Sequence, residues 1–205
     1  MFTVYGDRLS GNCYKVKLIL EFLSLPHEWV HVDILAGSTQ TAGFLAMNSN
    51  GKIPVLQIDD GQYLSESNAI LNFLAEGSEW LPDSGLPRAR VLQWQFFEQY
   101  SHEPYIAVAR YINKYLGLPE DRLGEYQSRQ EGGHRALRVM EQQLADTQYL
   151  IGRSPTIADI SLYAYTHVAE EGGFSLNAYP AINRWLSRIE DLPRYVKMSP
   201  GVAEK

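Results

Sequence analysis

Ser10 and Asn12 combine residue types that can stabilise an anion. They follow a short strand pattern, 2–5, and begin a helical pattern, 10–24. The first turn of a helix offers free backbone N–H groups and the positive end of the helix dipole. A hydroxyl and an amide donor placed there favour a site that stabilises an oxyanion or a thiolate. Ser10 is also a good N-cap, a role that requires no ligand.

Two further motifs have residues that could bind an extended ligand and an α-amino acid head group. Pro54 opens a strand pattern although proline cannot donate to a strand ladder. A cis Ile53–Pro54 bond would turn the Ile53 backbone outward to pair with an extended ligand, and Lys52 beside it offers a cation. Ser67 at the start of a helix, 65–76, can bind a carboxylate with its hydroxyl and its N–H. Glu66 can pair with an ammonium, so the two together fit an α-amino acid head group.

The remaining chemically suggestive residues are interpreted as structural. Thr156 and Asp159 have the spacing of a capping box. Cys13 lies in the first turn of the helix, where a thiol pKa can fall, so a thiol-transfer role stands beside the favoured reading of a small buried residue. A single cysteine excludes an internal disulfide and a cysteine-built zinc site. The five histidines are scattered, so no metal site is expected.

The elements that must position these residues divide the chain in two. Residues 1–76 follow the order β-α-β-(α)-β-β-α, with strand patterns also at 27–34, 53–58 and 62–64. Residues 77–86 are rich in Gly, Pro, Ser and Asp and indicate a linker. Residues 87–205 carry only helical patterns, at 88–116, 123–144, 156–169 and 179–192, with Pro104 as a kink or restart. The expected fold class is α/β plus all-α.

Composition excludes several classes of function. The 205 residues contain 18 Lys+Arg and 24 Asp+Glu, a formal net charge of −6, and show no basic patch. An acidic surface repels nucleic-acid phosphates, so a nucleic-acid partner is not expected. The best apolar stretch, 16–25, is interrupted by charges and is too short to span a bilayer. No secretory signal is evident, so we expect a cytoplasmic protein without a membrane partner.

The order and spacing of the four motifs resemble the cytosolic glutathione transferase family over nearly the whole chain. The matching segments read LSGNCYKVKLILEFL, NSNGKIPVLQIDDGQYLSESNAILNFLAE and SPTIADISLYAY. The resemblance implies a thioredoxin-like N-terminal domain over 1–76 and an all-helical C-terminal domain over 87–205. Ser10 stands where serine-type members, such as theta and zeta, keep their catalytic hydroxyl. The stretch Asn48-Ser49-Asn50-Gly51 departs slightly from the usual Asn-Pro-Asn-Gly.

The resemblance also implies a site and its partners. Glutathione is the expected co-substrate, with Ser10 as the thiolate donor and Asn12 as a second donor. The expected glutathione-binding residues are Gln40, Lys52, Ile53, Pro54, Glu66 and Ser67. The candidate residues for the electrophile pocket are Leu9, Tyr105, Arg110, Tyr111 and Tyr165. Family members are homodimers, so a homodimer is expected here.

The sequence leaves three kinds of function open. The favoured one is a glutathione transferase that activates the thiol for attack on a small hydrophobic electrophile. A glutathione-dependent reductase of disulfides or peroxides, or a related isomerase or dehalogenase, would use the same thiol. A non-catalytic binding or scaffold module would need only the fold. Retention of Ser10, Lys52, Glu66 and Ser67 together favours the enzyme.

Overall fold

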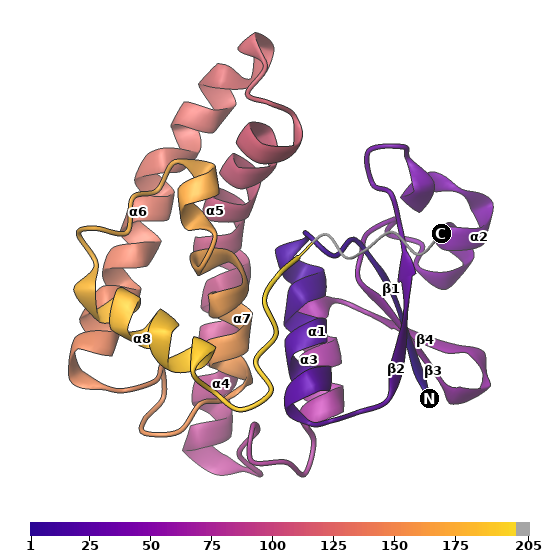
Figure 1. The fold of residues 1–205 in the computed structure, drawn as a ribbon, viewed down its shortest axis with the longest axis horizontal. Helices are drawn as coiled ribbons and strands as arrows, with labels where there is room; N and C mark the ends of the chain where they lie inside the picture. The colour runs from indigo at the N-terminus through magenta and orange to yellow at the C-terminus, as the bar shows by residue number, and fades with distance from the viewer. Residues whose placement is uncertain (200–205) are drawn as a thin grey trace. The chain divides into compact units, whose positions relative to one another are not determined.

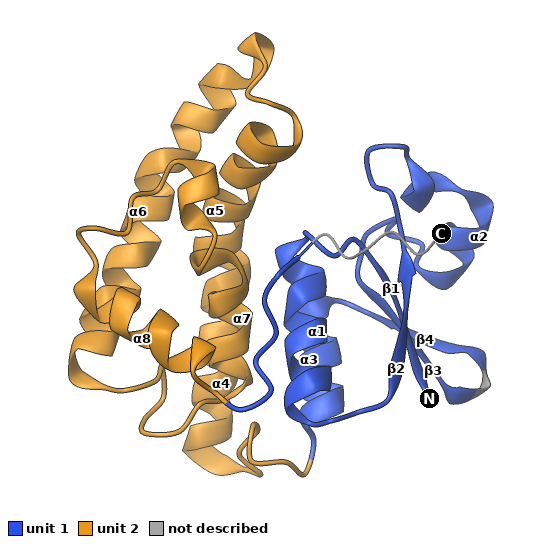
Figure 2. Cartoon of the chain, in the orientation of Figure 1, with its two compact units in different colours: residues 1–76, 193–205 blue, residues 77–192 orange. Residues whose placement is uncertain are grey.

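The computed structural model describes residues 1–199, except for the side chain of residue 60. The chain forms two compact units (Figure 2). Unit 1 comprises residues 1–76 together with the segment from 193 onward, and unit 2 comprises residues 77–192.

Unit 1 is built on a four-stranded sheet with the order β2-β1-β3-β4. The strands are β1 (Phe2–Gly6), β2 (His27–His31), β3 (Val55–Ile58) and β4 (Gln62–Ser65). β1 is parallel to β2 and antiparallel to β3, which is antiparallel to β4. The helices are α1 (Gly11–Phe22), α2 (Ala42–Met47) and α3 (Ser67–Ala75). Figure 1 shows α1 and α3 on one side of the sheet and α2 on the other.

The sheet has an apolar core on both faces because successive side chains of each central strand point to opposite faces, and helices cover both. Val4 and Leu56 are fully buried, and so are Leu18 and Ile19 of α1. On the α2 side, Phe44 forms a buried cluster with Val32 and Val55, and three partly buried residues pack against it: Tyr5, Met47 and Ile53. Burial of apolar surface contributes about 25 cal/mol per Å². These two layers therefore hold the strand ends that carry the candidate site.

Unit 2 is helical. Its helices are α4 (Gly85–Phe97), α5 (Glu103–Arg110), α6 (Leu123–Asp146), α7 (Ile157–Thr166) and α8 (Pro180–Glu190). Within residues 1–199, 3-10 turns lie at Ser38–Gln40 and Asp59–Gly61 of unit 1 and at Glu120–Arg122 and Ala169–Gly172 of unit 2. The predicted class, an α/β unit followed by a helical one, is confirmed.

Some element boundaries differ from the sequence-based ones. The strand expected over 27–34 ends at His31, and the one expected from Ile53 begins at Val55, after the proline that cannot join the ladder. The helix expected over 88–116 is interrupted by π-helical segments at Glu98–His102 and Tyr111–Tyr115. The first of these ends just before Pro104, which lacks the N–H needed for an i→i−4 bond.

The two ends of unit 2 also differ from the expected domain limits. Residues 77–86 were expected to be a linker that belongs to neither domain, but they group with unit 2. Of the expected helical domain 87–205, residues 193–199 group with unit 1, where the Tyr14 hydroxyl donates to the Val196 carbonyl at 2.6 Å. Residues 200–205 lie outside the described part of the chain. No helix within residues 1–199 is both long and apolar enough to cross a bilayer.

A buried carboxylate organises the start of α7. Thr156 and Asp159 form the capping box expected from their spacing. The Asp159 carboxylate accepts hydrogen bonds from the Thr156 and Leu150 N–H groups and from Trp185 Nε1, each at 2.9 Å. Burial raises the pKa of Asp159, and these donors oppose that rise. Asp159 therefore joins α7, α8 and the turn at Leu150, and its role is structural.

We predict first that the buried His167 of unit 2 makes the protein less stable at low pH. Burial lowers the pKa of His167 to about 4, and the ring stacks on Tyr163 with centroids 4.7 Å apart. The unfolded chain, in which the histidine pKa is about 6.5, binds this proton more readily, so stability falls as pH drops from about 6.5 towards 4. Between pH 7.5 and pH 5 the expected loss from this group is about 2 kcal/mol.

Urea unfolding of the native protein and of His167→Phe at both pH values measures this loss. The variant removes the titration, so its stability should fall with pH by about 2 kcal/mol less than that of the native protein. Equal pH dependence in the two proteins would contradict the assignment.

Candidate functional site

The sheet register brings three candidate segments to one end of unit 1. Val55, the first residue of β3, pairs with Tyr5 near the end of β1 and with Ser65 at the end of β4. The loop after β1, the residues before β3 and the residues after β4 therefore meet at the same end of the sheet. These are the segments that carry Ser10, Ile53–Pro54 and Glu66–Ser67.

Ser10 is the N-cap of α1, with extended backbone angles (φ −72°, ψ 126°). Its Oγ accepts from the Cys13 N–H at 3.5 Å. A hydroxyl that accepts one bond keeps its own proton to donate, so capping and thiolate binding are compatible. Asp7, which the sequence reasoning missed, shapes the preceding turn: its carboxylate accepts from Leu9 N at 3.0 Å and its carbonyl from Ser10 N at 3.1 Å. Aspartate is common in turns because its carboxylate can accept from the backbone N–H two residues later. Its place between a strand pattern and a helical pattern is the signal that could have identified Asp7.

Asn12 and Ser67 are brought into contact across α1 and α3. Ser67 Oγ lies 3.2 Å from Asn12 Oδ1. The Lys15 ammonium donates to Asn12 Oδ1 at 2.8 Å and to Ser67 Oγ at 3.3 Å. The sequence reasoning also missed Lys15. Lys15 precedes Leu18 by three residues and Ile19 by four, so helical spacing places it on the apolar face of its helix.

Glu66 has an unusual backbone conformation. It is the N-cap of α3 with φ 69° and ψ 110°, outside the regions that a non-glycine residue ordinarily occupies. Such a conformation costs on the order of 1–3 kcal/mol and is concentrated at functional sites. Its carbonyl accepts from Ile70 N at 2.9 Å and so starts the helix, while the side chain is exposed. The carboxylate is thus accessible to a ligand beside the N-terminus of α3.

The segment before β3 is held by Asn48. The Ile53–Pro54 bond is cis. Asn48 is buried, donates through Nδ2 to the Lys52 carbonyl at 2.7 Å and accepts through Oδ1 from Asn50 N at 3.1 Å. The sequence reasoning noted Asn48 only as part of a loop pattern, whereas the structure shows that it positions Lys52.

Gln40 lies against the same loop. A Cβ atom added at Gly51, where φ is +62°, would lie 2.7 Å from Gln40 Nε2. The Gln40 side chain is therefore next to Gly51 and one residue from Lys52, whose side chain is exposed. Two polar groups thus border the loop at which the glycyl end of glutathione was expected.

Cys13 is packed inside unit 1. It is 0% exposed and lies against Gly6, where an added Cβ would come within 2.6 Å of its Sγ. Burial raises the pKa of the Cys13 thiol to about 12, so the thiol is neutral near pH 7. This environment favours the packing role over a thiol-transfer role, because only a thiolate is an effective nucleophile.

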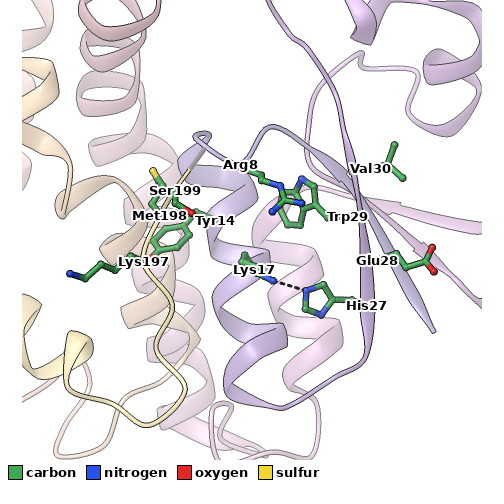
Figure 3. Close-up of a pocket in the computed structure, with 10 residues that line it drawn as sticks. All are labelled: Arg8, Tyr14, Lys17, His27, Glu28, Trp29, Val30, Lys197, Met198 and Ser199. Carbon is green, nitrogen blue, oxygen red and sulfur yellow. Dashed lines mark hydrogen bonds between the residues drawn. The ribbon is translucent and has the colours of Figure 1, made fainter. Parts of the chain in front are cut away.

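Unit 1 also has a cavity of about 510 Å³ that is separate from the expected glutathione-binding residues (Figure 3). Its walls come from the β1–α1 loop, α1, β2 and the segment after Tyr195, and none of the expected glutathione-binding residues lines it. Arg8 lies over the Trp29 ring at 5.9 Å in this cavity. Lys17 is already paired with Glu21 at 2.6 Å, and Glu28 adds a further carboxylate to the wall. The wall of this cavity therefore carries both cationic and anionic side chains.

The expected electrophile-pocket residues belong to both units. Leu9 lies in the β1–α1 loop of unit 1. In unit 2, Arg110 is buried and its Nε donates to Glu171 Oε2 at 2.7 Å, and Tyr165 is also buried. Tyr105 and Tyr111 are partly exposed; Tyr105 packs on Gly132, and the Tyr111 ring lies 5.5 Å from that of Tyr115. Within unit 2, Tyr105 and Tyr111 are therefore better placed than Arg110 or Tyr165 to meet a ligand.

Comparison with known families agrees with the fold. The model of the glutathione S-transferase N-terminal domain matches residues 9–76, and that of the glutathione S-transferase C-terminal domain matches residues 93–193. Together the two matches cover most of the chain. The chain belongs to the glutathione S-transferase family.

Individual relatives cover almost the whole length. A glutathione S-transferase from Pseudomonas fluorescens Pf-5 is 62% identical, with a TM-score of 0.95, over 96% of this chain and 98% of that one. A second family member from the same organism, solved with two glutathione bound, is 26% identical, with a TM-score of 0.81, over 94% and 89%. The disulfide-bond oxidoreductase YfcG of Escherichia coli K12 is 29% identical over 90% of this chain and 88% of its own. The family thus includes members that are described by different reactions.

The second prediction tests the state of Cys13. Because the thiol is buried and its pKa is raised to about 12, an aromatic disulfide reagent should leave the native protein unlabelled at pH 7.5 and label it fully in denaturant. Cys13→Ser serves as the control for non-specific reaction, since this chain has no other cysteine. Rapid stoichiometric labelling of the native protein would show that the thiol is accessible and reactive.

Proposed function

We propose that this chain is a glutathione transferase that activates the thiol of glutathione for attack on a small hydrophobic electrophile. The observation that carries the proposal is the register of β3, which brings Ser10, the cis Ile53–Pro54 bond and the positive-φ residue Glu66 to one end of the sheet. Membership of the family and the glutathione-bound relative support glutathione as the co-substrate.

Ser10 acts in this proposal as a hydrogen-bond donor. A free thiol has a pKa of about 8.5, so only a minor fraction is thiolate at neutral pH. A donated hydrogen bond and the N-terminus of α1 stabilise the anion, and each unit by which the pKa falls corresponds to about 1.4 kcal/mol. The thiol proton goes to solvent, and the thiolate forms a bond to the electrophilic carbon. In a substitution the leaving group departs with the electron pair of its bond to that carbon. In an addition the electron pair of the carbon's double bond moves to the neighbouring atom, which takes a proton from solvent. Ser10 is neither a base nor a covalent nucleophile, and Asn12 is a second donor to the same sulfur.

The remaining residues hold the peptide along the end of the sheet. The exposed Glu66 carboxylate pairs with the ammonium of the γ-glutamyl group, and the start of α3 at Ser67 receives its carboxylate. The Ile53 backbone pairs with the central residue of glutathione beside Pro54. Gln40 and Lys52, adjacent to one another across Gly51, receive the glycyl carboxylate. Leu9 within unit 1 and the partly exposed Tyr105 and Tyr111 within unit 2 are the candidate contacts for the electrophile.

A glutathione-dependent disulfide reductase is the second candidate. The similarity to the disulfide-bond oxidoreductase YfcG favours it, and Cys13 is not required. In that reaction two glutathione thiols are oxidised to glutathione disulfide while one substrate disulfide is reduced to two thiols. Assays of both reactions on one preparation distinguish the candidates. A protein that binds glutathione but catalyses neither reaction would be a binding module.

The proposal includes a homodimer in the cytoplasm. Leu92, Phe96 and Tyr100 follow one another at i, i+4 and i+8 around the end of α4, and Phe96 and Tyr100 are 61% and 78% exposed. Exposed aromatic rows of this kind are typical of interaction surfaces. A second copy of the chain is the partner we propose for this row. Glutathione maintains the reducing state of the cytosol, so the co-substrate is present in that compartment.

The third prediction separates the two roles of Ser10. Ser10→Ala removes both the cap and the donor, and we expect the turnover number with glutathione to fall about 10- to 100-fold and the pKa of the bound thiol to rise. Loss of the cap should also lower the free energy of unfolding by about 1 kcal/mol. Ser10→Thr keeps a hydroxyl that can cap and donate, so it is the matched control. Unchanged turnover and thiol pKa in Ser10→Ala would show that the hydroxyl is only a cap.

The fourth prediction tests the γ-glutamyl contact by calorimetric titration with glutathione. Glu66→Ala should weaken binding about 10- to 100-fold, because a hydrogen bond between charged groups contributes about 1.5–3 kcal/mol. Glu76→Ala, which changes an exposed glutamate at the other end of α3, should bind normally. Absence of binding by the native protein would contradict the proposed function as a whole.

A further inference from the structure

Lys15 is an unusual residue for its position. It is 0% exposed within α1, whereas Lys17 on the same helix is 32% exposed and paired with Glu21 in the ordinary way. Lysine is almost never fully buried unless its ammonium is bonded, because removing a charge from water is costly. A buried lysine in a small unit therefore requires polar partners, and these partners identify its role.

Two of its partners are the site residues Asn12 and Ser67. Lys15 Nζ lies 2.8 Å from Asn12 Oδ1 and 3.3 Å from Ser67 Oγ, and these two oxygens lie 3.2 Å apart. The three polar groups thus form a closed triangle, which we call the Lys15 triangle. It links α1, which carries the proposed thiolate donors, to α3, which carries the proposed γ-glutamyl site.

The chemistry of the ammonium determines the direction of each hydrogen bond. An ammonium only donates, so the Asn12 atom that faces it must be the oxygen, and the Asn12 amide nitrogen must point the other way. Ser67 Oγ accepts from Lys15, which leaves its own proton to donate to Asn12 Oδ1. The Ser67 hydroxyl is then committed within the triangle, and the backbone N–H groups at the start of α3 are left to receive a carboxylate.

The triangle also places a positive charge next to the residues that hold two anionic groups of the proposed ligand, the thiolate of its central residue and the carboxylate of its γ-glutamyl end. Screening by salt is weak for a buried charge, so it acts over longer distances than a surface lysine would. The thiolate held by Ser10 and Asn12 and the carboxylate held at Ser67 both gain from it. An uncharged residue of the same length would fill the space but would provide neither the charge nor the orientation of Asn12.

We propose that Lys15 is a positioning residue that turns the Asn12 amide toward the glutathione thiolate and supplies the buried positive charge of the glutathione site. This inference rests on the proposed function, which assigns Asn12 and Ser67 to glutathione. It adds a residue that acts through both of them. The alternative is that Lys15 only joins α1 to α3.

The fifth prediction compares Lys15→Met with Lys17→Met, two substitutions of the same kind two residues apart on α1. The pKa of the bound glutathione thiol is measured from the ultraviolet absorbance of the thiolate as pH is varied. Affinity is measured by calorimetry with S-methylglutathione, which has no ionisable thiol. Lys15→Met should raise the bound-thiol pKa by about one unit and weaken S-methylglutathione about tenfold. Lys17→Met should change neither.

A double-mutant cycle with Asn12→Ala tests whether Lys15 acts through Asn12. The rise in thiol pKa caused by Lys15→Met should be at least halved when Asn12 is already alanine, because the two residues share one hydrogen bond. A purely structural lysine would lower the free energy of unfolding in Lys15→Met and leave the bound-thiol pKa unchanged. That result, or full additivity in the cycle, would overturn the inference.

Two controls keep the result interpretable. If the native protein binds neither glutathione nor S-methylglutathione, the proposed function fails. If it binds them with a lowered thiol pKa that Lys15→Met leaves intact, only the role of Lys15 fails. Should Lys15→Met not fold, the ¹³Cε resonance of Lys15 in the labelled native protein is followed during a glutathione titration. It should shift while that of Lys17 does not, and an unchanged Lys15 resonance at saturation would overturn the inference.

Discussion

The arrangement of the site depends on the position of β3 between two antiparallel partners. Because Val55 pairs with both Tyr5 and Ser65, the end of β1, the start of β3 and the end of β4 must lie together. Each of these strand ends leads into a segment that the sequence marks for chemistry. A change of one residue in the register would turn alternate side chains to the opposite face and would separate them. The register of three short strands therefore determines whether the site exists.

Polar groups behind this end of the sheet are satisfied by one another. Asp7 holds the turn before Ser10, Asn48 holds the loop before Lys52, and Lys15 joins Asn12 to Ser67. Unpaired polar groups in such positions would cost about 1–3 kcal/mol each. The same bonds that remove this cost also set the direction of the groups left to face a ligand. Local stability and preorganisation of the site therefore have a common origin.

Unit 2 shows how a carboxylate can be structural although it is buried. Asp159 accepts from backbone and indole N–H donors, and these bonds account for its burial without a ligand. Lys15 differs from Asp159 because its partners, Asn12 and Ser67, stand at the strand ends that carry the candidate site. The distinction between a structural and a functional buried charge rests on what its partners can reach.

The amino-acid sequence by itself determined the order of elements, the two-part organisation, the capping box at Thr156 and Asp159, and the family resemblance, because these depend on local spacing and periodicity. Ser10 could be identified as a cap and as a donor from its place before a helix. Tertiary structure alone decided that Cys13 is fully buried against Gly6, that Arg110 is bonded to Glu171, and that Lys15 meets Asn12 and Ser67. These outcomes depend on burial and on contacts between α1 and α3 or between α5 and the turn at Glu171. No local pattern encodes such contacts, because the partners are brought together only when the elements pack.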